Sequence, residues 1–226
     1  MTAEASPSAG PPQAGLRPLG GPAAVLRGRV APITHLLYLH GFRSSPQSTK
    51  AKQVAAWMQT HRPALQWWCP QLPPSPRAAM ALIADGTANW PAASSAVIGS
   101  SLGGFYATAL AEQTRWRAVL LNPAVDPARD LARYVGEITA WHSDERFHFR
   151  AEFIDELKAI SPPALTRLSR YFAIIAKGDE VLSWEEMSAR YRGCKVKLLE
   201  GSDHAISDFE AQWPDVVDFL GVRDDD

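Results

Sequence analysis

Short apolar runs alternate with amphipathic stretches along most of the 226-residue chain. The apolar runs predict strands at 35–39, 65–69, 96–98, 118–121, 172–176 and 195–199. Between them, apolar residues at helical spacing predict helices at 49–60, 76–87, 102–114, 184–191 and 208–220. Strands that alternate with helices form a parallel sheet with helices on both faces. We therefore expect an α/β fold with a doubly wound, mostly parallel sheet of about six strands.

Two segments depart from this rhythm. Residues 1–32 are mainly Ala, Gly and Pro, without aromatic residues, which predicts a disordered tail ahead of a single domain at 33–223. The segment at about 126–163 is too long for a simple crossover and carries aromatic residues such as Tyr134 and Trp141. We interpret it as a small helical cap. The alternative is an ordinary helix pair that covers the edge of the sheet.

Composition narrows the class of protein. Hydrophobic residues make up 46% of the chain, charged residues 21%, and the net charge is -1, so no basic excess points to a nucleic-acid partner. No apolar run approaches the roughly 18–20 residues of a membrane span, and the N-terminus lacks the pattern of a secretory signal. We expect a cytoplasmic protein. Its oligomeric state cannot be read from the sequence.

The chain has two cysteines, Cys69 and Cys194. Neither belongs to a Cys-x-x-Cys pair or to a cluster with metal-ligand spacing, so a structural zinc site is not expected. A disulfide between them is conceivable. Small buried hydrophobes are the simpler interpretation.

The motif Gly99-Ser100-Ser101-Leu102-Gly103 follows one predicted strand and opens a predicted helix. This is the strand-turn-helix context of a nucleophile elbow, where the serine sits in a strained turn. The residues two before and two after the serine must be very small, so that strand and helix can pass closely. Gly99 and Gly103 frame Ser101 in this way, which makes Ser101 the candidate nucleophile.

An acid and a base follow Ser101 in the chain. This order of serine, aspartate and histidine is the one found in hydrolases that have a nucleophile elbow. Asp179 comes directly after the strand at 172–176, where it can accept the Nδ1–H of a histidine; Glu180 is the fallback, and a solvated surface turn is the alternative. His204 lies on the loop after the last strand, the place of the general base. We therefore expect a Ser101–His204–Asp179 triad.

The first predicted strand ends in Leu39-His40-Gly41-Phe42. In this position a backbone N–H helps to hold an oxyanion, so Phe42 and Leu102 are the candidate donors. His40 is expected to brace the loop rather than to act in catalysis. Candidates for the substrate pocket are His40, Gly41, Tyr106, Trp141 and Trp184, although core packing explains Trp184 equally well. Asp203 either lines the pocket or supplies a charge at a helix N-terminus.

Several motifs together resemble one known family. They are Leu37-Tyr38-Leu39-His40-Gly41-Phe42-Arg43-Ser44-Ser45, Pro70-Gln71-Leu72-Pro73, Gly99-Ser100-Ser101-Leu102-Gly103-Gly104-Phe105-Tyr106, Leu121-Asn122-Pro123-Ala124, Gly178-Asp179-Glu180-Val181-Leu182 and Asp203-His204. The chain resembles the small bacterial YqiA/YcfP-like (UPF0227-type) esterases, a compact branch of the α/β-hydrolases. The resemblance implies the same triad and a reduced sheet without the first two strands of larger hydrolases. The tail and the 126–163 segment depart from the family pattern.

These features lead to one expected function and two alternatives. We expect a serine hydrolase that cleaves a carboxylic ester or thioester (acyl-CoA-like) bond of a small molecule through an acyl-enzyme, without a metal or organic cofactor. The same scaffold also supports acyltransferases, lyases and cofactor-free peroxidases, or it can serve as a non-catalytic binding module.

Overall fold

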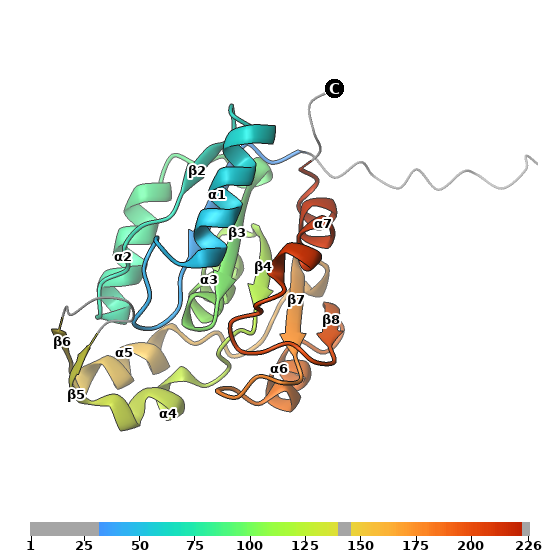
Figure 1. The fold of residues 1–226 in the computed structure, drawn as a ribbon. Coiled ribbons are helices and arrows are strands. Elements are labelled where there is room, and N and C mark those ends of the chain that lie inside the picture. The colour runs from blue at the N-terminus through green and yellow to red at the C-terminus, as the bar shows by residue number, and fades with distance from the viewer. Residues whose placement is uncertain (1–31, 140–145, 223–226) are drawn as a thin grey trace, which may run out of the picture. The chain divides into compact units, whose positions relative to one another are not determined.

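A six-stranded parallel sheet forms the centre of the computed structural model, which describes residues 32–139 and 146–222 (Figure 1). The strand order is β2-β1-β3-β4-β7-β8. The strands are β1 His35–Leu39, β2 Gln66–Trp68, β3 Ser95–Ser100, β4 Arg117–Leu121, β7 Tyr171–Ala176 and β8 Lys195–Leu199. This confirms the predicted sheet. The predicted strand ends lie within one residue of those observed, except that β3 continues to Ser100.

Helices cover both faces of the sheet. The five predicted helices are α1 Thr49–His61, α2 Pro76–Thr87, α3 Leu102–Thr114, α6 Trp184–Arg190 and α7 Phe209–Leu220. Short 3-10 turns occur at η1 Ala92–Ser94 and η3 Leu168–Arg170. Helices α1 and α7 pack on one face, and α2, α3 and α6 pack on the other. The doubly wound arrangement expected from the sequence is therefore confirmed. In the described ranges, no helix combines the length and apolar character needed to cross a bilayer.

Alternate residues of each strand build two separate cores. In β1, Leu37 and Leu39 pack with α2 and α3, whereas Leu36 and Tyr38 pack with α1 and α7. All four side chains are 1% exposed or less. Because both faces of the strand are buried, the sequence reads as a continuous apolar run rather than as an alternating one.

The segment interpreted as a cap lies beyond the carboxyl ends of the strands (Figure 1). It contains α4 Pro127–Leu131, η2 Ala132–Tyr134, the antiparallel strands β5 Gly136–Thr139 and β6 Arg146–Phe149, and α5 Glu152–Ile160. The two helices agree with the expectation, but the hairpin was not predicted, since two four-residue strands give too short a pattern to recognise. The described segment is therefore a mixed cap of helices and a hairpin.

A buried carboxylate fixes the cap to the main body. Glu156 of α5 is 8% exposed, and its Oε2 accepts hydrogen bonds from Ser75 Oγ at 2.6 Å and from the backbone N–H of Arg77 at 3.1 Å. Both donors lie at the start of α2. A buried carboxylate that accepts two hydrogen bonds is a directional tie between two helices.

The two cysteines lie at opposite edges of the sheet. Cys69 follows the edge strand β2, and Cys194 precedes the edge strand β8. Both are free and partly buried, so the disulfide alternative is wrong for this structure. Burial raises the pKa of the Cys69 thiol to about 12.

Helix α3 crosses the ends of β1 and β3 so closely that no side chain fits between the backbones. A Cβ placed on Gly103 would lie 2.0 Å from the carbonyl oxygen of Leu39, and one on Gly99 would lie 2.2 Å from the carbonyl oxygen of Gly103. Real Cβ atoms do not approach backbone oxygens to such distances. The two glycines of the motif are therefore required by backbone-to-backbone contact.

The substitution Gly103→Ala is expected to lower the free energy of unfolding by more than about 3 kcal/mol, the upper end of the usual cost of one extra carbon in a packed core. The control is Gly201→Ala, because a Cβ on Gly201 meets no atom within 4 Å. It is expected to change stability by less than about 0.5 kcal/mol. Urea denaturation of the variants measures both values. Equal stability of the two would contradict the crossing described above.

Candidate active site

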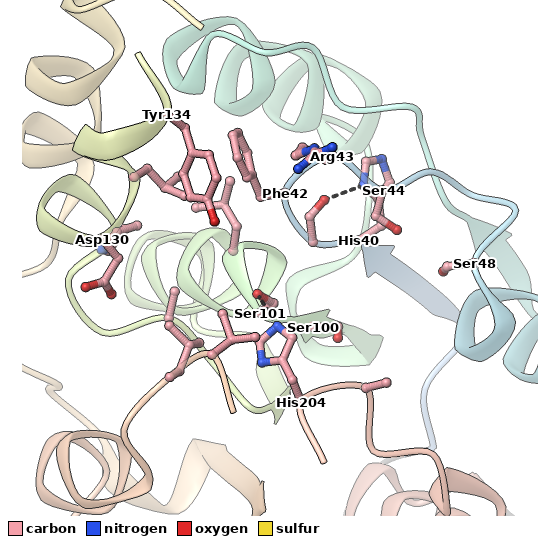
Figure 2. A pocket seen from close by; sticks show the side chains of 18 of the residues that line it. His40, Phe42, Arg43, Ser44, Ser48, Ser100, Ser101, Asp130, Tyr134 and His204 are labelled. Carbon is pink, nitrogen blue, oxygen red and sulfur yellow. Dashed lines mark hydrogen bonds between the residues drawn. The ribbon is translucent and has the colours of Figure 1, made fainter. Parts of the chain in front are cut away.

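Ser101 lies between β3 and α3 in a backbone conformation that few non-glycine residues adopt, with φ 56° and ψ −120°. Two neighbouring backbone groups hold it there. Its N–H donates to the carbonyl of Leu121 at 2.9 Å, and its own carbonyl accepts from the N–H of Ala124 at 3.0 Å. Such strain persists only where the surroundings impose it, and it is typical of functional sites. The strained turn directs the Ser101 side chain into the cavity shown in Figure 2.

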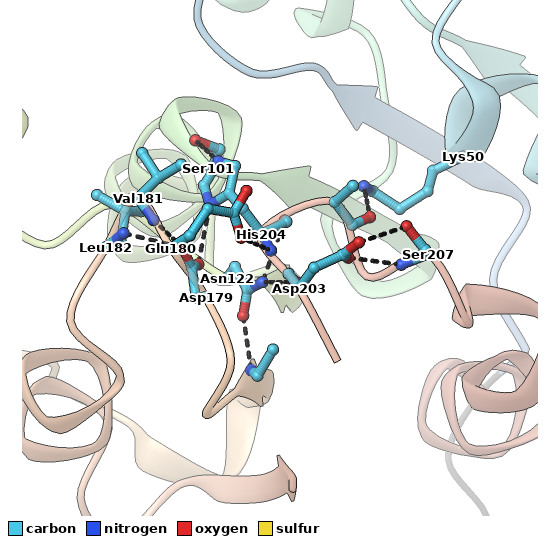
Figure 3. Close-up of polar contacts among 12 residues, drawn as sticks. Lys50, Ser101, Asn122, Asp179, Glu180, Val181, Leu182, Asp203, His204 and Ser207 are labelled. Carbon is cyan, nitrogen blue, oxygen red and sulfur yellow. Dashed lines mark hydrogen bonds and ion pairs between the residues drawn. The ribbon is translucent and has the colours of Figure 1, made fainter. Parts of the chain in front are cut away.

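The three residues expected to form a triad come together at the carboxyl edge of the sheet (Figure 3). The Nε2 atom of His204 lies 3.1 Å from Ser101 Oγ, and the Nδ1 atom of the same ring lies 2.8 Å from Asp179 Oδ2. The loops after β3, β7 and β8 supply them. The Asp179 side chain is 0% exposed, whereas that of His204 is 22% exposed. The acid is thus closed off from water, while the imidazole reaches the solvent-accessible cavity.

Backbone donors orient the Asp179 carboxylate. Its Oδ1 atom accepts from the N–H groups of Val181 and Leu182, each at 2.8 Å. The fallback acid, Glu180, has a different partner: its carboxylate accepts from the backbone N–H of His204 at 3.0 Å. Asp179, and not Glu180, therefore faces the imidazole ring.

The chain after β1 passes directly over Ser101. A Cβ on Gly41 would lie 3.2 Å from the Cβ of Ser101, and the carbonyl of Gly41 accepts from the N–H of Ser44 in a tight turn. Phe42 and Leu102 both line the cavity around Ser101. Leu102 is the first residue of α3, where an N–H has no acceptor within the helix. Their role as oxyanion donors stays a prediction.

His40 is 3% exposed and connects two loops. Its Nε2 atom accepts from the backbone N–H of Leu72 at 3.1 Å, which places the proton on Nδ1, 3.0 Å from the carbonyl oxygen of Gly41. Burial lowers the pKa of His40, so the neutral form is favoured. These contacts agree with a bracing role.

The cavity has a volume of about 810 Å³, a size that suits a small molecule. Ser101 and His204 lie between an apolar end and a polar end (Figure 2). The apolar end is lined by Phe42, Leu131, Tyr134, Val181 and Leu182, and the polar end by Tyr38, His40, Ser44, Ser48 and Lys50. The charged residues Arg129, Asp130 and Arg133, next to Leu131 and Tyr134 in the chain, also line the cavity. The described residues contain no group of three or more His, Cys, Asp or Glu side chains placed to hold a metal ion.

The structure places two predicted pocket residues elsewhere. Tyr106 is 2% exposed and belongs to the core beneath α3, and Trp184 packs against the same core, with the Lys177 ammonium 5.2 Å from its ring. Neither lines the cavity. Trp141 lies outside the described residues. Tyr134 supplies the aromatic wall instead, and its ring contacts that of Phe42 with centroids 5.5 Å apart.

Sequence reasoning also missed two polar residues near the triad. Asn122 is 0% exposed and contacts the loop that carries His204, and Lys50 contacts the same loop through the carbonyl of Ala205. The motif Leu121-Asn122-Pro123-Ala124 contained the only signal for Asn122. The carboxylate of Asp203 bonds Ser207 N–H and Oγ, at 2.9 and 2.6 Å, in a turn of the same loop.

His40 is expected to make stability depend on pH. The pKa of His40 is lowered in the folded state, so as the pH falls the unfolded chain binds a proton at His40 before the folded chain does. The stability that neutral His40 contributes is therefore present above about pH 6.5 and is lost as the pH falls below it. The variant His40→Gln should show a flatter decline in unfolding free energy between pH 7 and pH 5, by up to about 1.4 kcal/mol per pH unit. His61→Gln, an exposed position on α1, is the control. Identical pH slopes for wild type and His40→Gln would refute this assignment.

Three solved structures of similar fold are distant in sequence. Alpha/beta hydrolase domain-containing protein 10 from mouse superposes with a TM-score of 0.62 at 15% identity, covering 82% of this chain and 90% of that one. Est1E from Butyrivibrio proteoclasticus gives a TM-score of 0.59 at 14% identity, with 84% and 89% covered. Carboxylesterase CesB from Bacillus subtilis gives 0.53 at 16% identity, with 83% and 84% covered. At these identities the likeness establishes the α/β-hydrolase fold.

The family assignment comes from the sequence itself. The model of an uncharacterised protein family, UPF0227, matches residues 35–221, which include every strand of the central sheet and the loops that carry Ser101, Asp179 and His204. This match confirms the resemblance found in the motifs. The chain has the α/β-hydrolase fold and belongs to the UPF0227 family.

Proposed function

We propose that this protein is a serine hydrolase that cleaves carboxylic ester or thioester bonds of small molecules. The observation that carries the proposal is the continuous chain of hydrogen bonds from Asp179 through His204 to Ser101, which ends in the cavity. The order of these residues along the chain and their places on three strand-end loops support it further.

The first half of the reaction forms an acyl-enzyme. Ser101 Oγ attacks the carbonyl carbon of the substrate while His204 Nε2 takes its proton. Asp179 keeps the other proton of the ring on Nδ1 and stabilises the imidazolium. The tetrahedral intermediate collapses, the C–O or C–S bond to the leaving group breaks, and His204 returns the proton to the departing alcohol or thiol.

The second half regenerates the serine. A water molecule attacks the acyl carbon and gives a proton to His204. The ester bond to Ser101 then breaks, the carboxylic acid leaves, and His204 returns the proton to Ser101 Oγ. In both halves the N–H groups of Phe42 and Leu102 are the proposed donors to the oxyanion. The N-terminal position of Leu102 on α3 supports this role, since the helix dipole favours negative charge there.

The lining of the cavity supports an apolar acyl group. Phe42, Leu131 and Tyr134 form one end next to Ser101, and an acyl chain or ring bound there would remove apolar surface from water. Relatives in fold fit the same picture: CesB is a carboxylesterase, and Est1E has been solved with ferulic acid bound.

Ser101→Ala is expected to abolish turnover of p-nitrophenyl esters and labelling by a fluorescent fluorophosphonate, because both require the Oγ nucleophile. The matched control is Ser100→Ala, a neighbouring serine that is 8% exposed; it should retain labelling. Thermal denaturation of both variants verifies that they fold. Full esterase activity in folded Ser101→Ala would overturn the proposed function.

Tyr134→Ala is expected to raise KM for p-nitrophenyl hexanoate about tenfold more than KM for p-nitrophenyl acetate. The reason is that the substitution removes apolar surface that would contribute roughly 1–2 kcal/mol to binding of the longer acyl chain. The control is Val135→Ala, because Val135 is 44% exposed and does not line the cavity. Steady-state kinetics with the two esters gives the ratio. An equal change for acetate and hexanoate would mean that the acyl chain does not lie against Tyr134.

A further inference from the structure

The base of the proposed triad sits on a loop with little regular structure. His204 belongs to residues 200–208, between β8 and α7, where two turns supply the backbone hydrogen bonds: Ile206 N–H to Asp203 O at 3.0 Å and Phe209 N–H to Ile206 O at 2.9 Å. His204 is a central residue of the first turn, but neither hydrogen bond uses its own N–H or carbonyl. The peptide groups on either side of His204 instead bond with side chains from other parts of the chain, which help to set the direction of the imidazole.

One of these contacts is the side-chain amide of Asn122. Its Nδ2 atom donates to the carbonyl of Asp203 at 2.9 Å and to the carbonyl of His204 at 3.1 Å, and its Oδ1 atom accepts from the N–H of Ala176 at 2.8 Å (Figure 3). The three partners define the orientation of the amide, because a flipped group would face each partner with the wrong atom.

The two accepting carbonyls belong to the peptide groups on either side of the His204 Cα atom. Because peptide groups are planar, fixing both of them fixes φ and ψ of His204 and hence the direction of its Cα–Cβ bond. A single amide thus constrains both peptide groups that set where the imidazole points.

Asn122 is itself held rigidly. It follows β4 with φ 42°, a region that asparagine tolerates better than most residues, and its N–H donates to the carbonyl of Ile174 at 3.0 Å. Two residues later, Ala124 N–H donates to the carbonyl of Ser101. The segment 121–124 therefore contacts the turn of Ser101, and within it Asn122 links the strand that precedes Asp179 to the loop of His204.

Two further side chains hold the same backbone from the outside. Glu180 accepts from the N–H of His204 at 3.0 Å, and the Lys50 ammonium donates to the carbonyl of Ala205. Together with Asn122 they contact three consecutive peptide groups, from the one before His204 to the one after Ala205. Only Asn122 is fully buried, so only its contacts have no water to replace them.

We propose that Asn122 is the positioning residue of His204: its amide holds the two peptide groups flanking His204 so that the imidazole stays between Asp179 and Ser101. The proposal rests on the proposed function for its kinetic consequence. Its structural part, that Asn122 holds residues 200–208, can be tested without any activity.

The test variant is Asn122→Asp. Aspartate has the same shape, tolerates the same backbone conformation and can still accept from Ala176 N–H. It replaces the NH2 group, which donates to the carbonyls of Asp203 and His204, with an oxygen that repels them. Asn122→Gly, which suits φ 42° and removes the amide altogether, is the second variant in case the aspartate prevents folding. The control is Thr87→Val on α2, which removes a buried hydrogen bond to Ile83 without changing shape.

The first readout is hydrogen–deuterium exchange of the peptide covering 200–208. Exchange is expected to accelerate at least about tenfold in the Asn122 variants, with the central strands unchanged, and to stay at the wild-type rate in Thr87→Val. Unchanged exchange at 200–208 in the Asn122 variants would overturn the proposal, whether or not the wild type hydrolyses esters.

The second readout is the division between kcat and KM for a p-nitrophenyl ester. A misplaced base slows chemistry but not binding, so kcat is expected to fall about 100-fold in Asn122→Asp while KM stays within about twofold. Thr87→Val should keep both within about twofold. Faster exchange with an unchanged kcat would also overturn the positioning role. A wild type without turnover or labelling would instead count against the proposed function and leave the exchange result to decide the structural part.

Discussion

The passage of α3 over the end of β1, backbone against backbone, is the constraint on which the site depends. Because no side chain fits between Gly103 and the carbonyl of Leu39, strand β3 must turn into α3 within a single residue. That residue is Ser101, and its positive φ follows from the tight turn. The same crossing brings the chain after Leu39 over the serine, so that Gly41 lies against it. Ser101 and the surrounding loop are thus positioned by one steric requirement.

The polar groups of the site are arranged by their access to water. Asp179 is sealed and has three hydrogen-bond donors around its carboxylate, whereas His204 keeps one edge toward the cavity. Deeper in, where a charge would be costly to bury, the chain uses the neutral amide of Asn122. The charged groups that touch the His204 loop, Lys50 and Glu180, lie nearer the surface. Charge is therefore placed where solvent or a close partner can compensate it.

Local pattern was enough to predict the sheet and its covering helices, because buried parallel strands and amphipathic helices leave strong periodicities in the sequence. The loops that carry Ser101, Asp179 and His204 were also predictable, since each directly follows a strand. Which aromatic residues line the cavity was not. Tyr106 lies in the predicted helix at 102–114 and Tyr134 in the segment interpreted as a cap, but neither position shows which way the side chain faces. Only the packing of these elements decides that Tyr106 belongs to the core and Tyr134 to the cavity wall.

The hairpin β5–β6 and the contacts of Asn122 were unpredictable for a related reason. Four-residue strands carry too few positions for an alternation to stand out. The partners of Asn122 lie more than fifty residues away in the chain, so their meeting is a product of the strand order rather than of local sequence. Periodicity reports on the nearest neighbours of a residue in its own element. It says little about side chains that join separate loops.

The separation of the two cysteines has a consequence for how the protein responds to oxidants. Cys69 and Cys194 cannot reach each other across the sheet, and burial raises the pKa of both thiols, so little thiolate exists at neutral pH. Oxidants and alkylating reagents attack the thiolate. Both cysteines are therefore expected to stay reduced, and the fold is expected to be the same in reducing and in mildly oxidising solution.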